Sequence, residues 1–361
     1  LRRYAEEQPD LEWIQGVQLL YSAIPSGQAL TRQMLDNAVP DRPVLIYAFD
    51  EHTAWANTEA LRRAGILEGR STAAGSEIVM DQTQGLATGE LREPAAYDFV
   101  RDLIPEPDAA AQRALLRKGL ARAASYGLTS VHNMDGEAQQ AAFYGALEDL
   151  GELTLRVYMP YSVGPETPLE ALQGEAAPMR EQFAGGLVRA VSVKFFMDGV
   201  YESYTAVSLN GYPDQPHTFG VPIFDAEHYA RMVTEADRLG LQVITHACGD
   251  GAVRRVLDGY EAVQKRNGRR DSRHRVEHIE MIHLDDAPRF AQLDVIASMQ
   301  PLHAPLQEND PDVWSRRVRE EDWDRAFAWR TIRDAGARLV FGSDWPVALP
   351  DPLQGIAAAL N

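Results

Sequence analysis

Cysteine is almost absent from this chain: Cys248 is the single cysteine among 361 residues. One cysteine cannot form an intramolecular disulfide, which fits a reducing compartment, and we expect a cytoplasmic protein. The sequence also lacks any run of eighteen or more apolar residues. It therefore contains no candidate for a membrane-spanning helix.

Basic residues are scarce, with 35 Lys and Arg against 53 Asp and Glu and a formal net charge of −18. Nucleic-acid binding needs a clustered basic surface, so this balance argues against a nucleic-acid partner. We expect a small-molecule substrate and no membrane partner. Assembly into a homo-oligomer stays open.

Glycine-rich phosphate loops are missing as well, since neither a GxGxxG nor a Walker-type motif occurs. From about residue 109, short apolar runs alternate instead with amphipathic helical patterns. This alternation predicts a parallel sheet, either open or closed into a barrel. The predicted strands are 128–132, 153–159, 190–196, 241–246, 275–279, 295–299 and 339–341, and the predicted helices are 109–126, 225–239, 252–264, 325–334 and 353–360.

A lysine interrupts one of these strands, in the sequence SVKFFMDG. Val193 and Phe195 form one apolar face, so Ser192, Lys194 and Phe196 share the other. Burying a lone ammonium costs several kcal/mol. Lys194 must therefore be paired, neutralised or chemically modified.

Three further strand ends carry side chains that bind metals: His246 in VITHACGD, His278 in HRVEHIEM and Asp344 in FGSDWPV. Candidate ligands at the carboxyl ends of four separate strands are typical of a (β/α)8 barrel, which builds its site from the whole rim. An open sheet would concentrate its site at one switch point. We therefore predict an α/β fold, a (β/α)8 TIM-type barrel.

The first hundred residues do not continue this pattern. They hold a strand-like run at 44–49, a helical pattern at 55–64 and a loop-like stretch rich in Gly, Thr and Ser at 69–90. We expect residues 10–105 to form an inserted lobe over the active-site face. Residues 106–361 would supply the barrel strands.

The runs VKFFMDGVYESYTA, THACGD, RVEHIEM, SMQPLHA and GSDWPV, in this order, resemble the amidohydrolase superfamily. The resemblance is strongest to the amidohydrolase family 3 branch, which includes N-substituted formamide deformylase. It implies a metal-dependent hydrolase barrel in which 128–132 is strand two. Lys194, His246, His278 and Asp344 would end strands four, five, six and eight.

The resemblance also implies roles for these residues. Lys194 would be carbamylated by CO2 and would bridge two divalent metals, most often zinc. His246 and His278 would bind one metal through imidazole nitrogen. Asp344 would contact the other metal, take a proton from the attacking water and pass it to the leaving nitrogen.

Three more histidines are candidates for contacts with substrate. His132 ends the predicted second strand, His303 follows the seventh in MQPLHA, and His52 lies in DEHTAWANT, where the inserted lobe could reach the site.

One family feature is missing: relatives carry an HxH pair at the end of strand one, and no HxH occurs here. We therefore expect residues 1–361 to be an incomplete barrel without strand one, truncated at both ends. Such a chain should hold at most one metal, on the side of His246 and His278.

The predicted function is metal-dependent hydrolysis of a non-peptide C–N bond, in an amide or formamide, by a metal-activated water. A nucleobase-type deaminase is an alternative, although those relatives usually lack the strand-four lysine and place a Glu shortly after the strand-five histidine. A phosphotriesterase-like enzyme would share the lysine but not the lobe. A non-catalytic binding or scaffold protein that has lost HxH is the other alternative.

Overall fold

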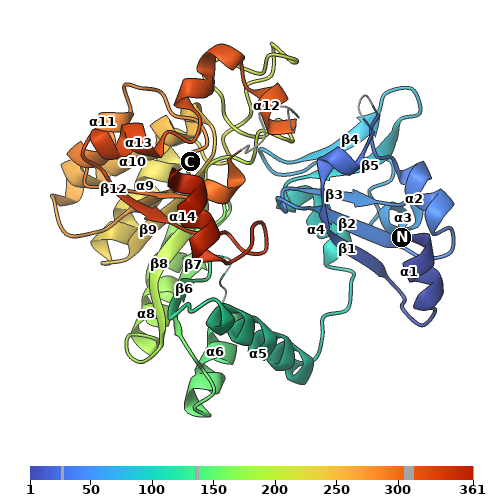
Figure 1. Ribbon diagram of the computed structural model, residues 1–361, viewed down its shortest axis with the longest axis horizontal. Coiled ribbons are helices and arrows are strands. Elements are labelled where there is room, and N and C mark those ends of the chain that lie inside the picture. Colours follow the sequence, from blue (N-terminus) through green and yellow to red (C-terminus); the bar gives the residue numbers. More distant parts are fainter. Residues whose placement is uncertain (26–27, 135, 137, 305–312, 361) are drawn as a thin grey trace.

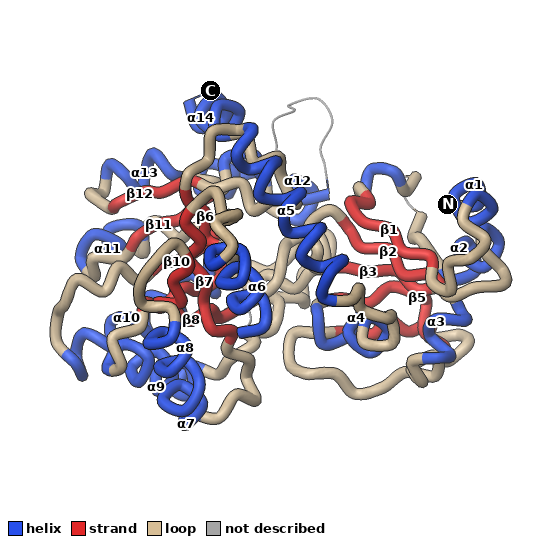
Figure 2. The backbone as a smooth tube through the Cα atoms, turned by 90° about the horizontal axis from the view of Figure 1, so that it is seen from below, coloured by secondary structure: helices blue, strands red, loops and turns tan. Residues whose placement is uncertain are grey.

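Two sheets organise the protein. The computed structural model describes residues 1–25, 28–134, 136, 138–304 and 313–360. Within these, a five-stranded sheet is built from the first hundred residues and a seven-stranded sheet from the remainder. Figure 1 shows them as two lobes, joined by the segment that leads into helix α5, and Figure 2 shows their strands as separate groups.

The first lobe has strand order β1-β2-β3-β5-β4. β1 and β2 are parallel, whereas the other neighbours pair antiparallel. Its elements are α1 (Arg2–Glu7), β1 (Ile14–Leu19), η1 (Tyr21–Ala23), α2 (Arg32–Ala38), β2 (Val44–Ala48), β3 (Thr53–Ala56), α3 (Thr58–Arg63), β4 (Glu77–Asp81), β5 (Leu86–Arg92) and α4 (Pro94–Arg101).

The second sheet is parallel throughout, with order β12-β11-β10-β9-β8-β7-β6. All seven predicted strands are confirmed, with ends that differ by three residues or fewer. They are β6 (Ser130–His132), β7 (Arg156–Ser162), β8 (Val188–Phe196), β9 (Gln242–Ala247), β10 (Arg275–His278), β11 (Ile296–Met299) and β12 (Arg338–Phe341).

Helices connect and cover these strands. They are α5 (Ala109–Ser125), α6 (Ala138–Asp149), α7 (Leu169–Ala171), η2 (Leu172–Ala176), α8 (Ala177–Gln182), α9 (Ala226–Arg238), α10 (Asp250–Asn267), α11 (Ala287–Gln292), η3 (Pro301–His303), α12 (Val313–Arg317), η4 (Glu320–Arg325), α13 (Trp329–Asp334) and α14 (Pro352–Leu360).

The parallel sheet is curled. Arg275 in the inner strand β10 reaches His132 on the edge strand β6, with 3.3 Å between Nη1 and Nδ1. At the other edge, Trp345 follows β12 and lies under Arg122 of α5, which precedes β6. Among the described residues, no strand pairs with the outer edge of β6 or of β12. The fold is thus α/β, and its curled seven-stranded sheet fits a TIM-type barrel.

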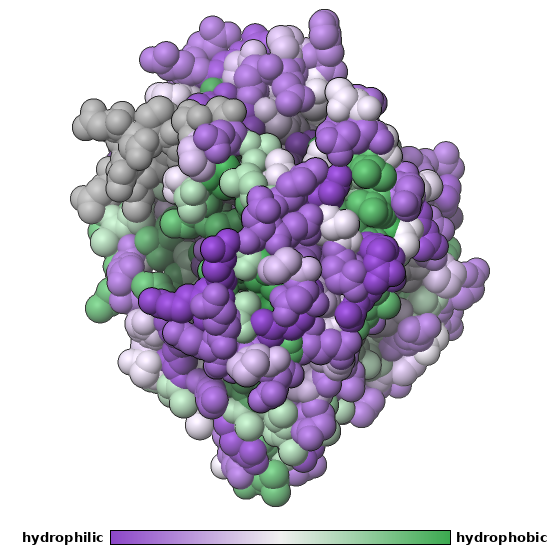
Figure 3. All heavy atoms as spheres, turned by 90° about the vertical axis from the view of Figure 1, so that its right-hand side faces the viewer, coloured by the Kyte–Doolittle hydropathy of each residue, from purple (hydrophilic) through white to green (hydrophobic). Residues whose placement is uncertain are grey.

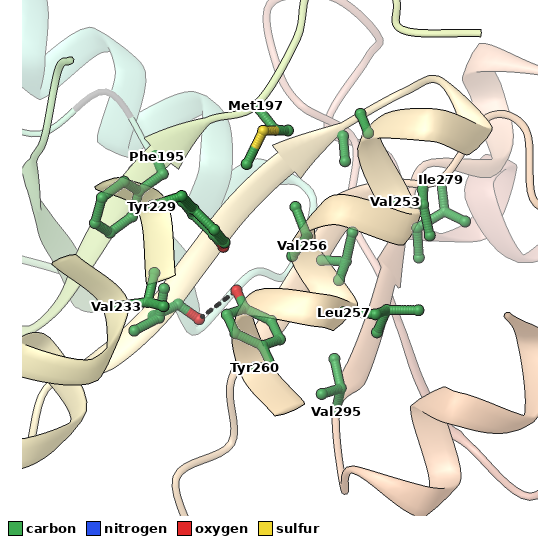
Figure 4. Packing of buried hydrophobic residues seen from close by; sticks show 14 of the residues in the cluster. Phe195, Met197, Tyr229, Val233, Val253, Val256, Leu257, Tyr260, Ile279 and Val295 are labelled. Atoms are coloured by element: carbon green, nitrogen blue, oxygen red, sulfur yellow. Dashed lines mark hydrogen bonds between the residues drawn. The ribbon is translucent and has the colours of Figure 1, made fainter. Parts of the chain in front are cut away.

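Strand β8 separates the core from the interior of the curl. Val193 and Phe195 are fully buried and face the helices, where the Phe195 and Tyr229 rings lie 5.5 Å apart in an edge-to-face contact. Figure 4 shows these two rings together with Val233 of α9. The alternate residues Ser192 and Lys194 are buried on the opposite face, as the period-2 pattern predicts.

Two predicted helices begin later than the sequence pattern suggested. Trp55 lies in β3, and Asn57 then caps α3 by accepting a hydrogen bond from the backbone N–H of Ala60. Helix α13 starts only at Trp329, because Phe327 has a φ of 44° and its N–H donates to the carbonyl of Glu280. Local polar contacts override helical periodicity in both places, and before α13 a left-handed residue does so as well.

The predicted loop at 69–90 is wrong, since β4 and most of β5 lie within it. Residues of β5 alternate between buried and half-buried, which is the period of a strand. Its small residues make room for α2: a Cβ added at Gly89, where φ is 112°, would lie 2.7 Å from the backbone nitrogen of Arg32 and 2.8 Å from the Ala56 carbonyl oxygen. Glycine here reflects close packing, not a turn.

One face of the molecule is largely hydrophilic (Figure 3), as the content of charged residues predicts. Figure 3 shows the side of the molecule that lies on the right of Figure 1, where hydrophilic side chains cover most of the face that is turned to the viewer. Throughout the described ranges, no helix combines the length and apolarity needed to cross a membrane.

The packing at Gly89 yields a prediction. Gly89→Ala should lower the free energy of unfolding by about 3 kcal/mol or more, because it adds overpacking to backbone strain. Gly85→Ala is the matched control, since Gly85 also has a positive φ (68°) but nothing lies within 4 Å of an added Cβ. It should cost only about 1 kcal/mol. Urea unfolding of both variants checks this, and equal losses would contradict the packing argument.

Candidate functional site

His246 and His278 meet at the carboxyl ends of neighbouring strands. The β9–β10 register pairs His246 with Glu277 and Ala247 with His278. Their imidazole centroids lie 4.5 Å apart. His246 is buried and His278 is 9% exposed, so both rings sit in a largely dehydrated part of the interior.

His303 and Asp344 extend the group to the next two strands. His303 ends η3, directly after β11, and its ring stacks 6.0 Å from that of His278. Asp344 follows β12 and is exposed. One ligand atom from each of His278, His303 and Asp344 can be chosen so that all lie within 4.8 Å of one another, close enough to hold a metal ion.

Lys194 is 3% exposed, and among the described residues no carboxylate lies within ion-pair distance of its ammonium. Its Nζ lies 4.0 Å from the centroid of the Phe196 ring. Burial lowers the pKa of Lys194, although the charges of Glu277 and Asp344 oppose this. The same lysine charge helps to lower the pKa of His246 and His278, which places it electrostatically beside both rings.

Hydrogen bonds select the tautomers of two histidines. Nε2 of His246 lies 3.0 Å from the carbonyl oxygen of Gly199. A carbonyl oxygen only accepts, so Nε2 carries the proton and Nδ1 keeps a lone pair. Nε2 of His303 faces the Ser343 carbonyl in the same way at 3.4 Å. Burial also lowers the pKa of both rings, which favours the neutral, lone-pair form that binds metals.

The donor set therefore fits a divalent metal: neutral imidazoles with a free nitrogen, an adjacent carboxylate and a buried lysine. Imidazole and carboxylate are ligands that zinc and related ions accept.

Asp198 holds the loop after β9 in place. One carboxylate oxygen accepts the N–H of Cys248 at 3.0 Å, and the other accepts those of Val207 and Gly249 at 2.8 and 2.9 Å. Asp198 is fully buried. Because three backbone donors converge on it, Asp198 fixes the chain that leaves His246.

Cys248 is a site residue that sequence reasoning missed. Its Sγ lies 3.5 Å from Nε2 of His246, and His246, Cys248 and His278 form a second group that could hold a metal. Burial raises the pKa of its thiol. Its position two residues after His246 was the available indication, since alternate strand residues share a face.

His52 reaches the site from the first lobe. Its ring centroid lies 5.1 Å from that of His246, and its Nδ1 lies 2.7 Å from Oε2 of Glu93, a buried residue that the sequence did not single out. Burial opposes protonation of His52, but the Glu93 carboxylate outweighs it and raises the pKa of His52 to about 9.

His132 stands apart from the other predicted residues. It ends the edge strand β6, stacks on Tyr158 with centroids 4.9 Å apart, and its Nδ1 lies 3.3 Å from Nη1 of the buried Arg275 of β10. The structure thus brings six of the seven predicted residues to one region: Lys194, His246, His278, Asp344, His303 and His52.

Lys194 supplies a prediction about stability. Lys194→Met should raise the free energy of unfolding of the metal-free protein by about 1–3 kcal/mol, because it removes an unpaired buried charge at similar length. Lys265→Met, at an exposed lysine of α10, is the control and should stay within about 0.5 kcal/mol. Denaturant titration measures both. A loss of stability in Lys194→Met would mean that the ammonium is well accommodated.

The sequence profile of the Amidohydrolase family matches residues 1–361. The chain is 29% identical to Protein LONG AFTER FAR-RED 3 of Arabidopsis thaliana over 93% of its length and to the putative amidohydrolase YtcJ of Bacillus subtilis over 98%. It is 24% identical to N-substituted formamide deformylase of Arthrobacter pascens over 98%. The chain spans 58%, 64% and 65% of these relatives, respectively.

A solved structure agrees with the fold. An uncharacterized metal-dependent hydrolase from Pyrococcus horikoshii OT3 superposes with a TM-score of 0.70 at 25% identity, covering 98% of this chain and 66% of that one. The profile match over the whole chain confirms the resemblance that the ordered motifs predicted. The chain belongs to the amidohydrolase family.

Proposed function

We propose that this chain carries the machinery for metal-dependent hydrolysis of a non-peptide C–N bond, in an amide or a formamide. The observation that supports it most is the convergence of His278, His303 and Asp344, with His246 beside them, at the carboxyl ends of adjacent parallel strands. Family membership supports hydrolase chemistry. The formamide class is suggested by the similarity to N-substituted formamide deformylase.

In this proposal His246, through Nδ1, and His278 would hold a divalent ion, most simply zinc. Lys194 would join them as a carbamate, which turns a lysine without an ion-pair partner among the described residues into an anionic ligand. Asp344 would contact a second ion. A bound divalent ion supplies a lowered pKa for water and polarisation of the substrate carbonyl.

Carbamylation suits the surroundings of Lys194. The reaction joins a neutral amine to CO2 and releases a proton. Burial lowers the pKa of Lys194, which favours the neutral amine. The absence of an ion-pair partner among the described residues leaves the nitrogen available.

Asp344 moves the proton. Its exposed carboxylate takes a proton from the attacking water as the water oxygen bonds to the carbonyl carbon. It then donates this proton to the nitrogen as the C–N bond breaks, which yields a carboxylic acid or formate and an amine. His52 and His303 would contact the substrate, and His132 stays a weaker candidate because it lies at the sheet edge.

The domain arrangement is part of the proposal. Residues 10–105 would act as a lobe over the active-site face, since inserted loops at this end of a barrel usually set specificity. The contact between His52 and His246 supports this. An eighth strand between β6 and β12 would complete the barrel.

Loss of the proposed proton carrier should abolish turnover. Asp344→Asn should lower kcat by about 10²–10⁴-fold, because the amide cannot accept the proton from water. The assay is amine release from a panel of N-substituted formamides and amides by the zinc-loaded protein, with a chelator-treated sample and Lys265→Met as controls. Undiminished hydrolysis by Asp344→Asn would contradict the assigned role, and hydrolysis that persists after metal removal would contradict the proposed function.

Metal content gives a separate prediction. Because no HxH pair occurs, the chain should hold at most one tightly bound zinc, on the histidine side. Elemental analysis should show this zinc lost in His246→Ala or His278→Ala but retained in Asp344→Ala. Two tightly bound metals per chain would contradict this ligand assignment.

A further inference from the structure

A continuous set of contacts runs from the first lobe to Nε2 of His246, the ring nitrogen that carries the proton. Glu93, at the end of β5, uses both carboxylate oxygens: Oε2 lies 2.7 Å from Nδ1 of His52, and Oε1 accepts the Thr205 hydroxyl proton at 2.6 Å. The Thr205 hydroxyl in turn accepts the N–H of Val200 at 2.9 Å. Val200 follows Gly199, whose carbonyl accepts the Nε2 proton of His246.

Close packing tightens this interlobe contact, which consists of His52, Glu93, Thr205 and Gly199. A Cβ added at Gly199 would overlap Oε1 of Glu93 and Oγ1 of Thr205. Glu93 is 2% exposed and Thr205 is 8% exposed. The Glu93 backbone is held too, since its N–H donates to the carbonyl of His52 at 2.7 Å.

The Thr205 hydroxyl has one proton and three possible acceptors within reach. Besides Glu93, the Ser203 hydroxyl oxygen lies 2.8 Å away and the Val200 carbonyl oxygen 3.2 Å away. The shorter bond to a charged carboxylate is the stronger one. Without Glu93, the hydroxyl proton would turn to Ser203 or to the Val200 carbonyl, and the Thr205 oxygen that accepts the Val200 N–H would lose the bond that orients it.

We propose that Glu93 is a positioning residue supplied by the first lobe. Through Thr205 it fixes the Gly199 carbonyl, which selects the Nε2-protonated tautomer of His246 and leaves Nδ1 to bind. The position of the first lobe thereby influences which ring nitrogen of His246 carries the proton. The consequence for metal affinity rests on the proposed function, whereas the consequence for the tautomer does not.

The test uses two conservative pairs in the full chain. Thr205→Ser keeps the hydroxyl, and Thr205→Val removes it at nearly constant volume. Glu93→Gln keeps an acceptor for Thr205 and a group that can bond to His52, whereas Glu93→Ala removes both. Glu90→Gln is the matched control, since Glu90 lies on the same strand but pairs with Arg92 within the lobe.

The first readout is ¹⁵N NMR of histidine-labelled, metal-free protein, with the His246 resonances assigned by their loss in His246→Gln. We expect a single Nε2-protonated tautomer in the wild type, Thr205→Ser and Glu90→Gln, and a mixture of tautomers in Thr205→Val and Glu93→Ala. If Glu93→Ala does not fold, the threonine pair decides. An unchanged His246 tautomer in folded Thr205→Val would overturn the inference.

The second readout is Zn²⁺ affinity by competition with a chromophoric chelator. Thr205→Val and Glu93→Ala should bind zinc about 10-fold more weakly or worse, in the range seen when partners of metal-binding histidines are removed. Glu93→Gln should lie closer to the wild type. A purely structural contact would lower the melting temperature of the variants without changing the tautomer or this affinity. A wild type that binds no zinc would overturn the proposed function and leave the tautomer result to decide the inference.

Discussion

Lys194 carries an amino group into the interior of the curled sheet, where no described carboxylate lies within ion-pair distance. Removing that amino group from water is energetically unfavourable, and the ionisation of the neighbouring side chains depends partly on it. This desolvation lowers the pKa of the lysine. Burial likewise lowers the pKa of the two neighbouring histidines, His246 and His278, and the lysine charge adds to this. A cluster of neutral nitrogen donors follows from burial alone, before any ion is considered.

The register of the parallel strands brings these side chains together in space. Parallel strands end at the same edge, so side chains separated by about thirty residues along the chain become neighbours. For His246 and His303, backbone carbonyls then fix which ring nitrogen is free. For His246 this carbonyl belongs to Gly199, which packs against Glu93 of the first lobe, so both lobes contribute to the surroundings of one side chain.

The parallel strands could be predicted from the sequence, as could the positions of four residues near strand ends, because both depend on short-range periodicity that burial enforces. Lys194 was conspicuous for the same reason: a charge on an apolar strand is rare unless it has a role. The roles of these four residues as ligands stay a prediction. What sequence reasoning missed depends on tertiary contacts. The strand that contains Gly89 has the composition of a loop, and only its packing against α2 explains the glycine. Nothing in the local sequence distinguishes Glu93 from other acidic residues, because its partner Thr205 is distant in sequence. For His132 the prediction stays untested: it ends the edge strand β6 and lies 3.3 Å from the buried Arg275 of β10.

Zinc K-edge X-ray absorption of the zinc-loaded chain tests the central claim most directly, namely that the strand-end histidines with Lys194 form the metal centre. The account predicts a shell of nitrogen and oxygen at about 2.0–2.1 Å, with the outer-shell scattering of imidazole rings that disappears in His246→Ala and His278→Ala. A sulfur shell at about 2.3 Å would place Cys248 in the first coordination sphere instead, and imidazole scattering unaffected by both substitutions would contradict the assignment of the site.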